Sequence, residues 1–590
     1  MDSVIHKQIV SFIWSIADDC LRDVYVRGKY RDVILPMTVI RRLDAVLEGT
    51  KDAVLKMKAT LDKAGVKEQT AALCNTAGQS FCNWSPFRLK DLTSRANPQK
   101  LKTDFIAYLD GFSPNVQVIL EKFKFRNQID TMIDAGILGS VIEKFVDPRI
   151  GVTQLDNHAM GTVFEELIRR FNEENNEEAG EHWTPRDVVE LMADLIFRPI
   201  ADKIKDATYT VYDGASGTGG MLTVSQDRLL ELSRRNGRTV SIHLFGQEIN
   251  PETYAITKAD MLLKGEGAEA DNIAYGSTLS SDGFPSRQFD FMLSNPPYGK
   301  SWKNDAEKLG GKKGIQDTRF VTSFADEGEF SMIPRVSDGQ LLFLLNNVSK
   351  MKETTELGSR IAEVHNGSSL FTGDAGQGES NARRYLIERD LVEAIIALPE
   401  NMFYNTGIGT FIWVLSNRKE ARRRGKIQLI DATVLKSPLR KNLGKKNCEI
   451  SPEIRHQIID LLLAFEENEY SKIFDNSAFG YWKVTVLRPQ LGKDGKPLRD
   501  MKGKLVADKN TDTEQIPLDY PGGIDAFIQA EVLPYAPDAW VDEKKTQMGY
   551  EISFTKHFYK PVQLRPLAEI VADIRAIEAE TDGLLEEVLG

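Results

Sequence analysis

A short apolar segment that leads into a glycine-rich loop and then into an apolar helix start constrains the fold of this chain most. Residues 207–212 have the composition of a buried strand, and a helical pattern begins at Met221. Between them stands Asp213-Gly214-Ala215-Ser216-Gly217-Thr218-Gly219-Gly220. A strand, a glycine loop and a helix in this order form the first unit of a nucleotide-binding α/β sheet, whose ligand lies beyond the carboxyl ends of the strands.

Further apolar segments of strand length alternate with helical patterns from about residue 155 to residue 425. The expected strands are 241–248, 289–293, 360–364, 394–398 and 411–415. Such alternation favours a doubly wound, Rossmann-like α/β sheet. Upstream, apolar residues recur at helical spacing, as at Ile9, Ile13 and Ile16, so residues 1–150 are expected to form a helical domain.

Two carboxylates stand at the ends of the first two expected strands. Asp213 precedes the glycine loop, and a carboxylate there suits a cationic amino-acid group better than a phosphate. Glu248 ends the segment 241–248, 35 positions further on, where such sheets hold ribose hydroxyls. A structural turn and a solvated glutamate are the simpler interpretations of each feature alone. Their order along the chain favours a ligand site that includes Ser216, Gly217, Thr218 and Gly219.

The motif Asn295-Pro296-Pro297-Tyr298 follows the expected strand 289–293. The Asn295 side-chain oxygen and the Pro296 carbonyl can accept both hydrogens of a planar amino group, which aims the nitrogen lone pair at an electrophilic methyl. Consecutive prolines stiffen the turn, and Tyr298 offers a face for stacking a base. The alternative is an ordinary turn that ends a strand, because Asn-Pro and Pro-Pro are common in loops.

Together these motifs resemble the N6-adenine DNA methyltransferases, and more closely the modification subunits of type I restriction-modification systems. The segment before the glycine loop resembles the part of that family that folds over the methionine end of S-adenosylmethionine. This segment comprises Glu181, His182, Trp183, Thr184, Pro185 and Arg186. The family commonly has Pro and Cys or Ala where this chain has Gly214 and Ser216, and the residue that contacts the cofactor adenine stays open between Asp271 and Ser277.

The resemblance implies methyl transfer from S-adenosylmethionine to adenine N6, without a metal ion, in duplex DNA. It also implies a specificity subunit that recognises the sequence, with two modification subunits bound to each, and leaves open whether a restriction nuclease is a further partner. Two alternatives of other classes remain open. One is an enzyme that methylates a glutamine amide in protein or a base amine in RNA, and the other is a scaffold without catalytic activity.

Composition agrees with a cytoplasmic enzyme of several domains. The chain has 590 residues, a formal net charge of −11 and four cysteines without metal-ligand spacing, and no stretch of 18 apolar residues predicts a membrane span. The expected domains are 1–150, 151–430 and 431–590, the last a mixed region that ends in an amphipathic helix. That helix either packs on its own domain or docks on the specificity subunit.

Three segments carry many basic residues. Residues 299–338 are rich in glycine and charge, including Lys300, Lys303 and Arg319, and are expected to form a long loop in which Trp302 could stack on an extruded base. The other two are 422–426 and 440–446. Surface solvation and DNA phosphates are both compatible with such runs.

Overall fold

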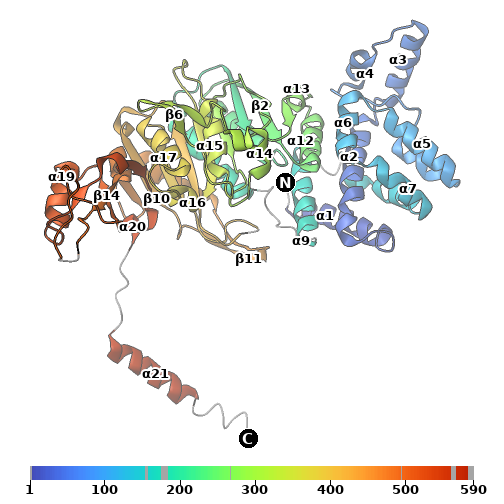
Figure 1. Ribbon diagram of the computed structural model, residues 1–590. Helices are drawn as coiled ribbons and strands as arrows, with labels where there is room; N and C mark the ends of the chain where they lie inside the picture. The colour runs from blue at the N-terminus through green and yellow to red at the C-terminus, as the bar shows by residue number, and fades with distance from the viewer. Residues whose placement is uncertain are drawn as a thin grey trace. The chain divides into compact units, whose positions relative to one another are not determined.

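The computed structural model describes residues 3–152, 157–174, 184–265, 267–404, 406–492, 495–559 and 566–581. The chain divides into two compact units, 1–552 and 553–590 (Figure 1). The second unit contains α20 (Phe554–Phe558) and α21 (Leu567–Thr581), so the expected C-terminal helix is confirmed as far as Thr581. None of the described helices has the length and apolar character needed to cross a membrane.

The N-terminal part of the first unit is helical, as its spacing predicts. Buried apolar residues at that spacing, such as Ile13, Ile16, Ile34 and Leu43, form its core. The helices are α1 (Ser3–Cys20), α2 (Arg31–Leu47), α3 (Lys51–Lys63), α4 (Thr70–Ala77), α5 (Pro98–Asp110), α6 (Pro114–Lys122), α7 (Arg126–Asp134) and α8 (Leu138–Phe145).

A nine-stranded sheet forms the centre of the first unit, in the order β13-β10-β8-β9-β7-β4-β1-β2-β3. Its strands are β1 (Thr208–Asp213), β2 (Ser241–Glu248), β3 (Ile273–Tyr275), β4 (Phe291–Ser294), β7 (Arg360–Asn366), β8 (Val392–Ala397), β9 (Thr410–Ser416), β10 (Lys426–Asp431) and β13 (Ser471–Asp475). All neighbours pair in parallel except β9, which is antiparallel to β7 and β8, and β13, which is antiparallel to β10. The expected strands are confirmed, with ends that shift by a few residues.

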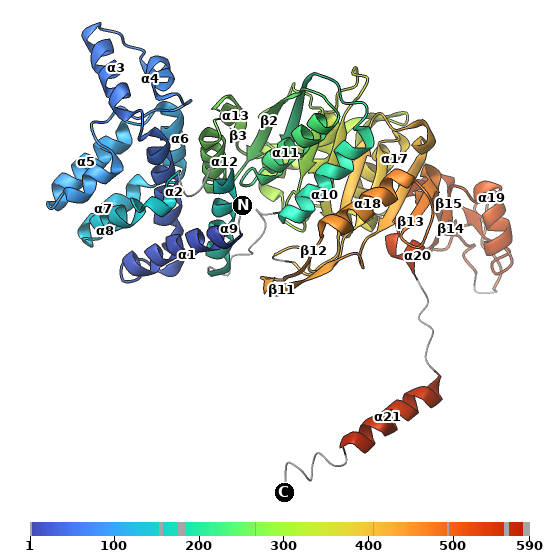
Figure 2. The ribbon, with the colours of Figure 1, turned by 180° about the vertical axis from the view of Figure 1, so that it is seen from behind.

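Helices cover both faces of this sheet. Figure 1 shows α15 (Gln340–Ser349), α16 (Ser368–Phe371) and α17 (Gly378–Glu388) on one face. Figure 2, the view from behind, shows α10 (Arg186–Phe197), α11 (Gly220–Arg235) and α18 (Pro452–Ala464) on the other. Because helices cover both faces, every residue of β8 is buried. Strands in such a position are mostly apolar in sequence, as β8 is.

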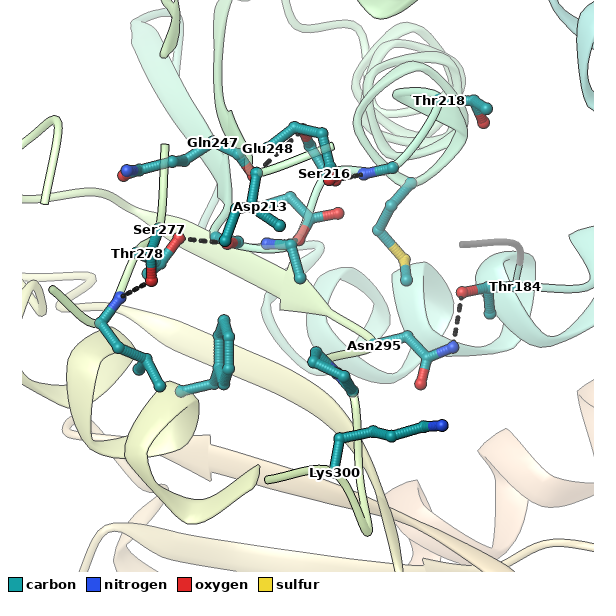
Figure 3. A pocket seen from close by; sticks show the side chains of 18 of the residues that line it. Thr184, Asp213, Ser216, Thr218, Gln247, Glu248, Ser277, Thr278, Asn295 and Lys300 are labelled. Carbon is teal, nitrogen blue, oxygen red and sulfur yellow. Dashed lines mark hydrogen bonds between the residues drawn. The ribbon is translucent and has the colours of Figure 1, made fainter. Parts of the chain in front are cut away.

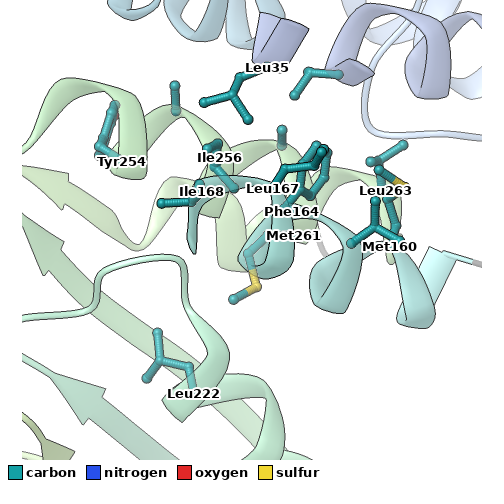
Figure 4. Packing of buried hydrophobic residues seen from close by; sticks show 14 of the residues in the cluster. Leu35, Met160, Phe164, Leu167, Ile168, Leu222, Tyr254, Ile256, Met261 and Leu263 are labelled. Carbon is teal, nitrogen blue, oxygen red and sulfur yellow. The ribbon is translucent and has the colours of Figure 1, made fainter. Parts of the chain in front are cut away.

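Two helices connect the N-terminal helices to the sheet. Helix α9 (Asn157–Glu174) packs on α1 and α2, while α12 (Pro251–Leu263) packs on α2, α6 and α9. Leu35 of α2, Phe164 and Leu167 of α9 and Ile256 of α12 meet there (Figure 4). An ion pair of 3.5 Å between Arg31 and Glu252 adds a polar contact. The N-terminal helices and the sheet therefore share one hydrophobic core.

Smaller elements complete the first unit. Two antiparallel pairs, β5 (Val321–Phe324) with β6 (Glu327–Ser331) and β11 (Ser437–Leu443) with β12 (Lys446–Glu449), project from loops. A four-stranded sheet contains β14 (Gly480–Leu487), β15 (Asp512–Pro517), β16 (Trp540–Val541) and β17 (Gln547–Tyr550). The large sheet runs on to β13, beyond residue 430, and the three expected domain boundaries stay a prediction.

Candidate active site

A cavity of about 310 Å³ lies at the carboxyl edge of β1, β2 and β4 (Figure 3). Its volume is at the lower end of the range for small-molecule sites. Its wall brings together residues that the sequence predicts from four separate segments. They are Thr184, Arg186, Asp213, Ser216, Gly217, Thr218, Glu248, Asn295 and Pro297.

Asp213 ends β1 and is buried beneath the glycine loop. Its Oδ1 accepts hydrogen bonds from the Ala215 N–H at 2.9 Å and from the Ser294 hydroxyl at 2.7 Å. Burial, with a smaller contribution from the carboxylates of Glu248 and Glu363, raises the pKa of Asp213 to about 7 against these two hydrogen bonds. A cationic ligand group beside this carboxyl would favour its ionised form.

The glycine loop brings backbone close to the cavity. Gly217 and Gly219 have φ values of 52° and 82°, which side chains rarely adopt, and Gly219 directly precedes α11. A Cβ at Gly219 would lie 2.9 Å from Thr257 Cγ2, and the Thr257 hydroxyl donates to the Gly217 carbonyl at 2.6 Å. Glycine at 219 therefore satisfies both the backbone conformation and the close packing of α12 against the loop.

Glu248 ends β2 and joins the second strand to the glycine loop. Its Oε2 accepts from the Gly217 N–H at 2.8 Å and its Oε1 from the Asn250 N–H at 2.7 Å. These two hydrogen bonds hold the carboxylate at the end of β2, and a carboxylate is a group that accepts hydrogen bonds from hydroxyls. Its position on the cavity wall is compatible with the expected role as ribose ligand, which stays a prediction.

Asn295 follows β4, and its side-chain amide is held in one orientation. Its Nδ2 donates to the Thr184 hydroxyl oxygen at 3.0 Å (Figure 3). Its Oδ1 is buried and has no hydrogen-bond partner among the residues that the structure describes. A buried acceptor without a partner costs free energy, about 1–3 kcal/mol in proteins. The geometry therefore offers this oxygen to a donor that enters the cavity.

Other expected site residues lie elsewhere. Pro296 and Tyr298 are not part of the cavity wall as the described residues form it. Tyr298 is half-buried against the core, and burial raises its pKa to about 12. Pro185 directly precedes α10. Glu181, His182 and Trp183 lie outside the described residues. The stacking role of Tyr298 and the cofactor roles of those three residues stay predictions.

Several wall residues were not predicted from the sequence. They are Glu165 of α9, Met221 of α11, Ile249 and Thr278 in the segments after β2 and β3, and Phe343 of α15. Of the two residues considered for the cofactor adenine, Ser277 lines the cavity, whereas Asp271 does not and pairs at 3.8 Å with Lys258. Apolar residues at the ends of expected strands and helices are the weak signal that was available.

The stretch 299–338 is not one long loop, because it contains α14 (Lys303–Lys308) as well as β5 and β6. Arg319 is absorbed into the fold, since its guanidinium donates to the Thr278 and Leu279 carbonyls at 2.8 and 2.6 Å. The Trp302 indole lines the cavity but is buried, and its Nε1 donates to the Arg335 carbonyl at 3.0 Å.

The strand order, with the antiparallel β9 inserted between β7 and β8, confirms a doubly wound, Rossmann-like α/β sheet whose cavity lies at the carboxyl ends of its parallel strands. Residues 155–478 match the family described as N-6 DNA Methylase, and residues 9–145 match the HsdM N-terminal domain. The chain belongs to the N-6 DNA methylase family.

In the described residues no group of three or more His, Cys, Asp or Glu side chains could hold a metal ion.

Similar proteins include two methylase subunits of type I restriction enzymes. The MjaIX subunit of Methanocaldococcus jannaschii is 24% identical over 60% of this chain and 57% of its own length. The MpnII subunit of Mycoplasma pneumoniae is 29% identical over 51% of each chain, so the present chain spans just over half the length of these relatives. A type I methyltransferase subunit from Streptococcus thermophilus has a similar fold, with a TM-score of 0.59 and 21% identity over 80% of this chain and 97% of that one.

Proposed function

We propose that this chain transfers a methyl group from S-adenosylmethionine to the N6 amino group of adenine in duplex DNA. The observation that carries the proposal is the Asn295 amide, whose Oδ1 is buried without a partner among the described residues while Thr184 fixes the other end. An acceptor with this placement suits a planar amine that must give up its conjugation before it can attack.

The cofactor site fits a ligand with a cationic amino group and an adenosine. S-adenosylmethionine supplies a sulfonium methyl as the electrophile. Asp213 offers a carboxyl that a cation would ionise, and the loop at Gly217 and Gly219 allows close backbone approach. Glu248 places a carboxylate on the cavity wall at the end of β2. The segment 181–186 would cover the methionine end, and Ser277 is the favoured neighbour of the cofactor adenine.

The target adenine would leave the duplex, because its N6 is inaccessible to an enzyme while the base is stacked. Asn295 Oδ1 and the Pro296 carbonyl accept the two amine hydrogens, Pro297 stiffens the turn, and Tyr298 provides a stacking face. These contacts partly offset unstacking, which costs a few kcal/mol. The chain's own residues hold and orient the amine, and we expect that no metal ion is needed.

We further propose that the chain acts in the cytoplasm as the modification subunit of a type I complex, two copies with one specificity subunit, to which a nuclease subunit can be added. The family and the relatives named as methylase subunits support this assignment. Helix α21 would dock on the specificity subunit, because Leu567, Ile570, Val571 and Ile574 recur at helical spacing. The domains would be 1–150, 151–430 and 431–590.

The test is to purify the chain with and without its specificity subunit, add S-adenosylmethionine and DNA, and map 6-methyladenine across a genome, with Asn295→Ala as control. Methylated adenine at defined sites with the wild-type complex, and none with the variant, is the expected result. Methylglutamine in protein or a methylated base in RNA would reassign the acceptor. A folded chain that does not bind S-adenosylmethionine would favour the scaffold.

A further inference from the structure

We propose that the hairpin formed by β11 and β12 binds the phosphate backbone of duplex DNA beside the methylation site. This inference rests on the proposed function, which makes duplex DNA the substrate. Residues 436–446, here called the basic arm, contain five basic residues and no acidic one, although the whole chain has a formal net charge of −11. Such a local concentration of one sign is the electrostatic pattern of a nucleic-acid contact.

Four of the five cations face solvent. Lys436, Arg440, Lys441 and Lys445 are exposed, and none of them has an ion-pair partner among the residues that the structure describes. The one acidic residue of the two strands, Glu449, pairs in register with Ser437 at the opposite end from the turn. Figure 2 shows β11 and β12 leaving the body of the first unit as an arm. The cations therefore repel one another unless an anion from outside the chain neutralises them.

The other basic run, 422–426, shows how this chain treats cations that serve its own fold. Arg422 pairs with Glu420 at 2.9 Å, buried Arg423 lies 3.6 Å from Glu393, and Lys426 pairs with Asp475 at 2.6 Å. Internal contacts therefore engage three of the four cations of that run, and Arg424 is exposed. The four exposed cations of the basic arm have no such partners among the described residues, so composition alone does not distinguish the two runs and the structure does.

The fifth cation fixes the arm next to the cavity. Lys446 is buried, and its Nζ lies 3.0 Å from Asp187 Oδ2 and donates to the Met402 carbonyl at 3.1 Å. Asp187 Oδ2 also accepts from the Ile450 N–H at 2.9 Å, so both ends of β12 are attached to the first turn of α10. Arg186 in that same turn lines the cavity.

This attachment fixes the base of the arm close to the carboxyl edge of the sheet, the edge at which the cavity lies. The Lys445 N–H donates to the Tyr404 carbonyl at 2.8 Å, in the loop that follows the carboxyl end of β8 and precedes β9. Lysine and arginine contacts to phosphates hold register on the duplex but carry no base information. The arm would thus hold the strand near the target adenine, while the sequence is recognised elsewhere.

The experiment uses the full chain, alone and with its specificity subunit, and a fluorescently labelled duplex without S-adenosylmethionine. The test variant is Arg440→Gln/Lys441→Gln/Lys445→Gln. The matched control removes the same charge from exposed Lys502, Lys504 and Lys509, between β14 and β15. Anisotropy at several salt concentrations gives Kd and its salt dependence, and a thermal melt with S-adenosylmethionine binding checks the fold and cofactor site of each variant.

The arm variant is expected to weaken duplex binding about tenfold or more near 0.1 M salt. It should also lower the magnitude of the slope of log K against log salt by about 2.7, because each of the three lost phosphate contacts contributes about 0.9. The control should leave both unchanged. Equal weakening in both variants, or an arm variant that binds duplex normally but loses the specificity subunit, would overturn the proposal. An inactive wild type that binds duplex through the arm would instead contradict the proposed function.

Discussion

The Ser294 hydroxyl donates a hydrogen bond of 2.7 Å to Asp213 Oδ1, and this bond joins the two halves of the site. Ser294 is the last residue of β4 and directly precedes Asn295, while Asp213 ends the neighbouring β1 and precedes the glycine loop. The group proposed to hold the acceptor amine and the group proposed to hold the cofactor are therefore connected through one buried hydrogen bond.

Cofactor affinity is expected to depend on the ionisation of Asp213. Its pKa in the unliganded protein is raised to about 7, so at lower pH the carboxyl is protonated and cannot attract the cationic amino group. Affinity for S-adenosylmethionine should therefore rise with pH up to about 7, at most about tenfold per pH unit, since one pKa unit corresponds to a factor of ten. Isothermal titration at several pH values in the absence of DNA measures this.

Asp213→Asn separates cofactor binding from stability. Because burial raises the pKa of Asp213 in the folded protein above its ordinary value, ionisation of this residue in the unfolded chain lowers the unfolding free energy as pH rises from about 4 to about 7. The variant should lose cofactor affinity and its pH dependence yet unfold at a higher temperature near pH 7. A variant with unchanged affinity would show that Asp213 does not bind the amino group.

Asn295→Ala is expected to reduce methylation by about 100-fold or more, because it removes an acceptor that orients the reacting amine. Cofactor affinity should change little, since Asn295 contributes an acceptor rather than a charge to the cavity.

Tyr298→Ala should reduce methylation and weaken binding of duplexes in which the target adenine is extruded. Radiolabelled methyl transfer with a thermal melt tests both, and near-normal turnover in both variants would exclude the assignment.

Thr184→Val should lower the methylation rate by acting through Asn295. Valine keeps the shape of threonine but cannot accept the 3.0 Å hydrogen bond from Asn295 Nδ2, so the amide is free to turn. A net loss of about 1 kcal/mol predicts a roughly fivefold lower kcat. Thr184→Ser, which retains the hydroxyl, should restore kcat, and the ratio of the two is the readout. A drop in cofactor affinity with normal kcat would assign Thr184 to the cofactor instead.

Gly219→Ala is expected to impair the cofactor site through two effects. The positive φ of 82° costs a side chain about 1–2 kcal/mol, and its Cβ would also lie 2.9 Å from Thr257 Cγ2. Gly237 has a φ of 67° with nothing within 4 Å of a Cβ, so Gly237→Ala carries the conformational cost alone. Chemical denaturation and cofactor titration should show the larger loss for Gly219→Ala, with cofactor affinity unchanged in the control.

Much of the central sheet was predictable because its signals are local. An apolar strand, a glycine loop and a helix start lie within a few residues, and segment 241–248 is β2 to the residue. Motifs that lie at strand ends were predictable for the same reason, since parallel strands bring their carboxyl ends to one edge. The secondary structure inside the stretch 299–338 was not predictable, because α14, β5 and β6 are short and rich in polar residues.

The sequence by itself determined the residue types of the site and the order along the chain of the strands that carry them. Only the tertiary structure decided which groups meet, because hydrogen bonds such as the one that Asn295 Nδ2 donates to the Thr184 hydroxyl oxygen join residues 111 positions apart. It also decided that Arg319 is internal and that the basic arm is exposed, since the state of a charge depends on partners from distant segments. Burial, which raises the pKa of Asp213, is likewise a property of the packed fold.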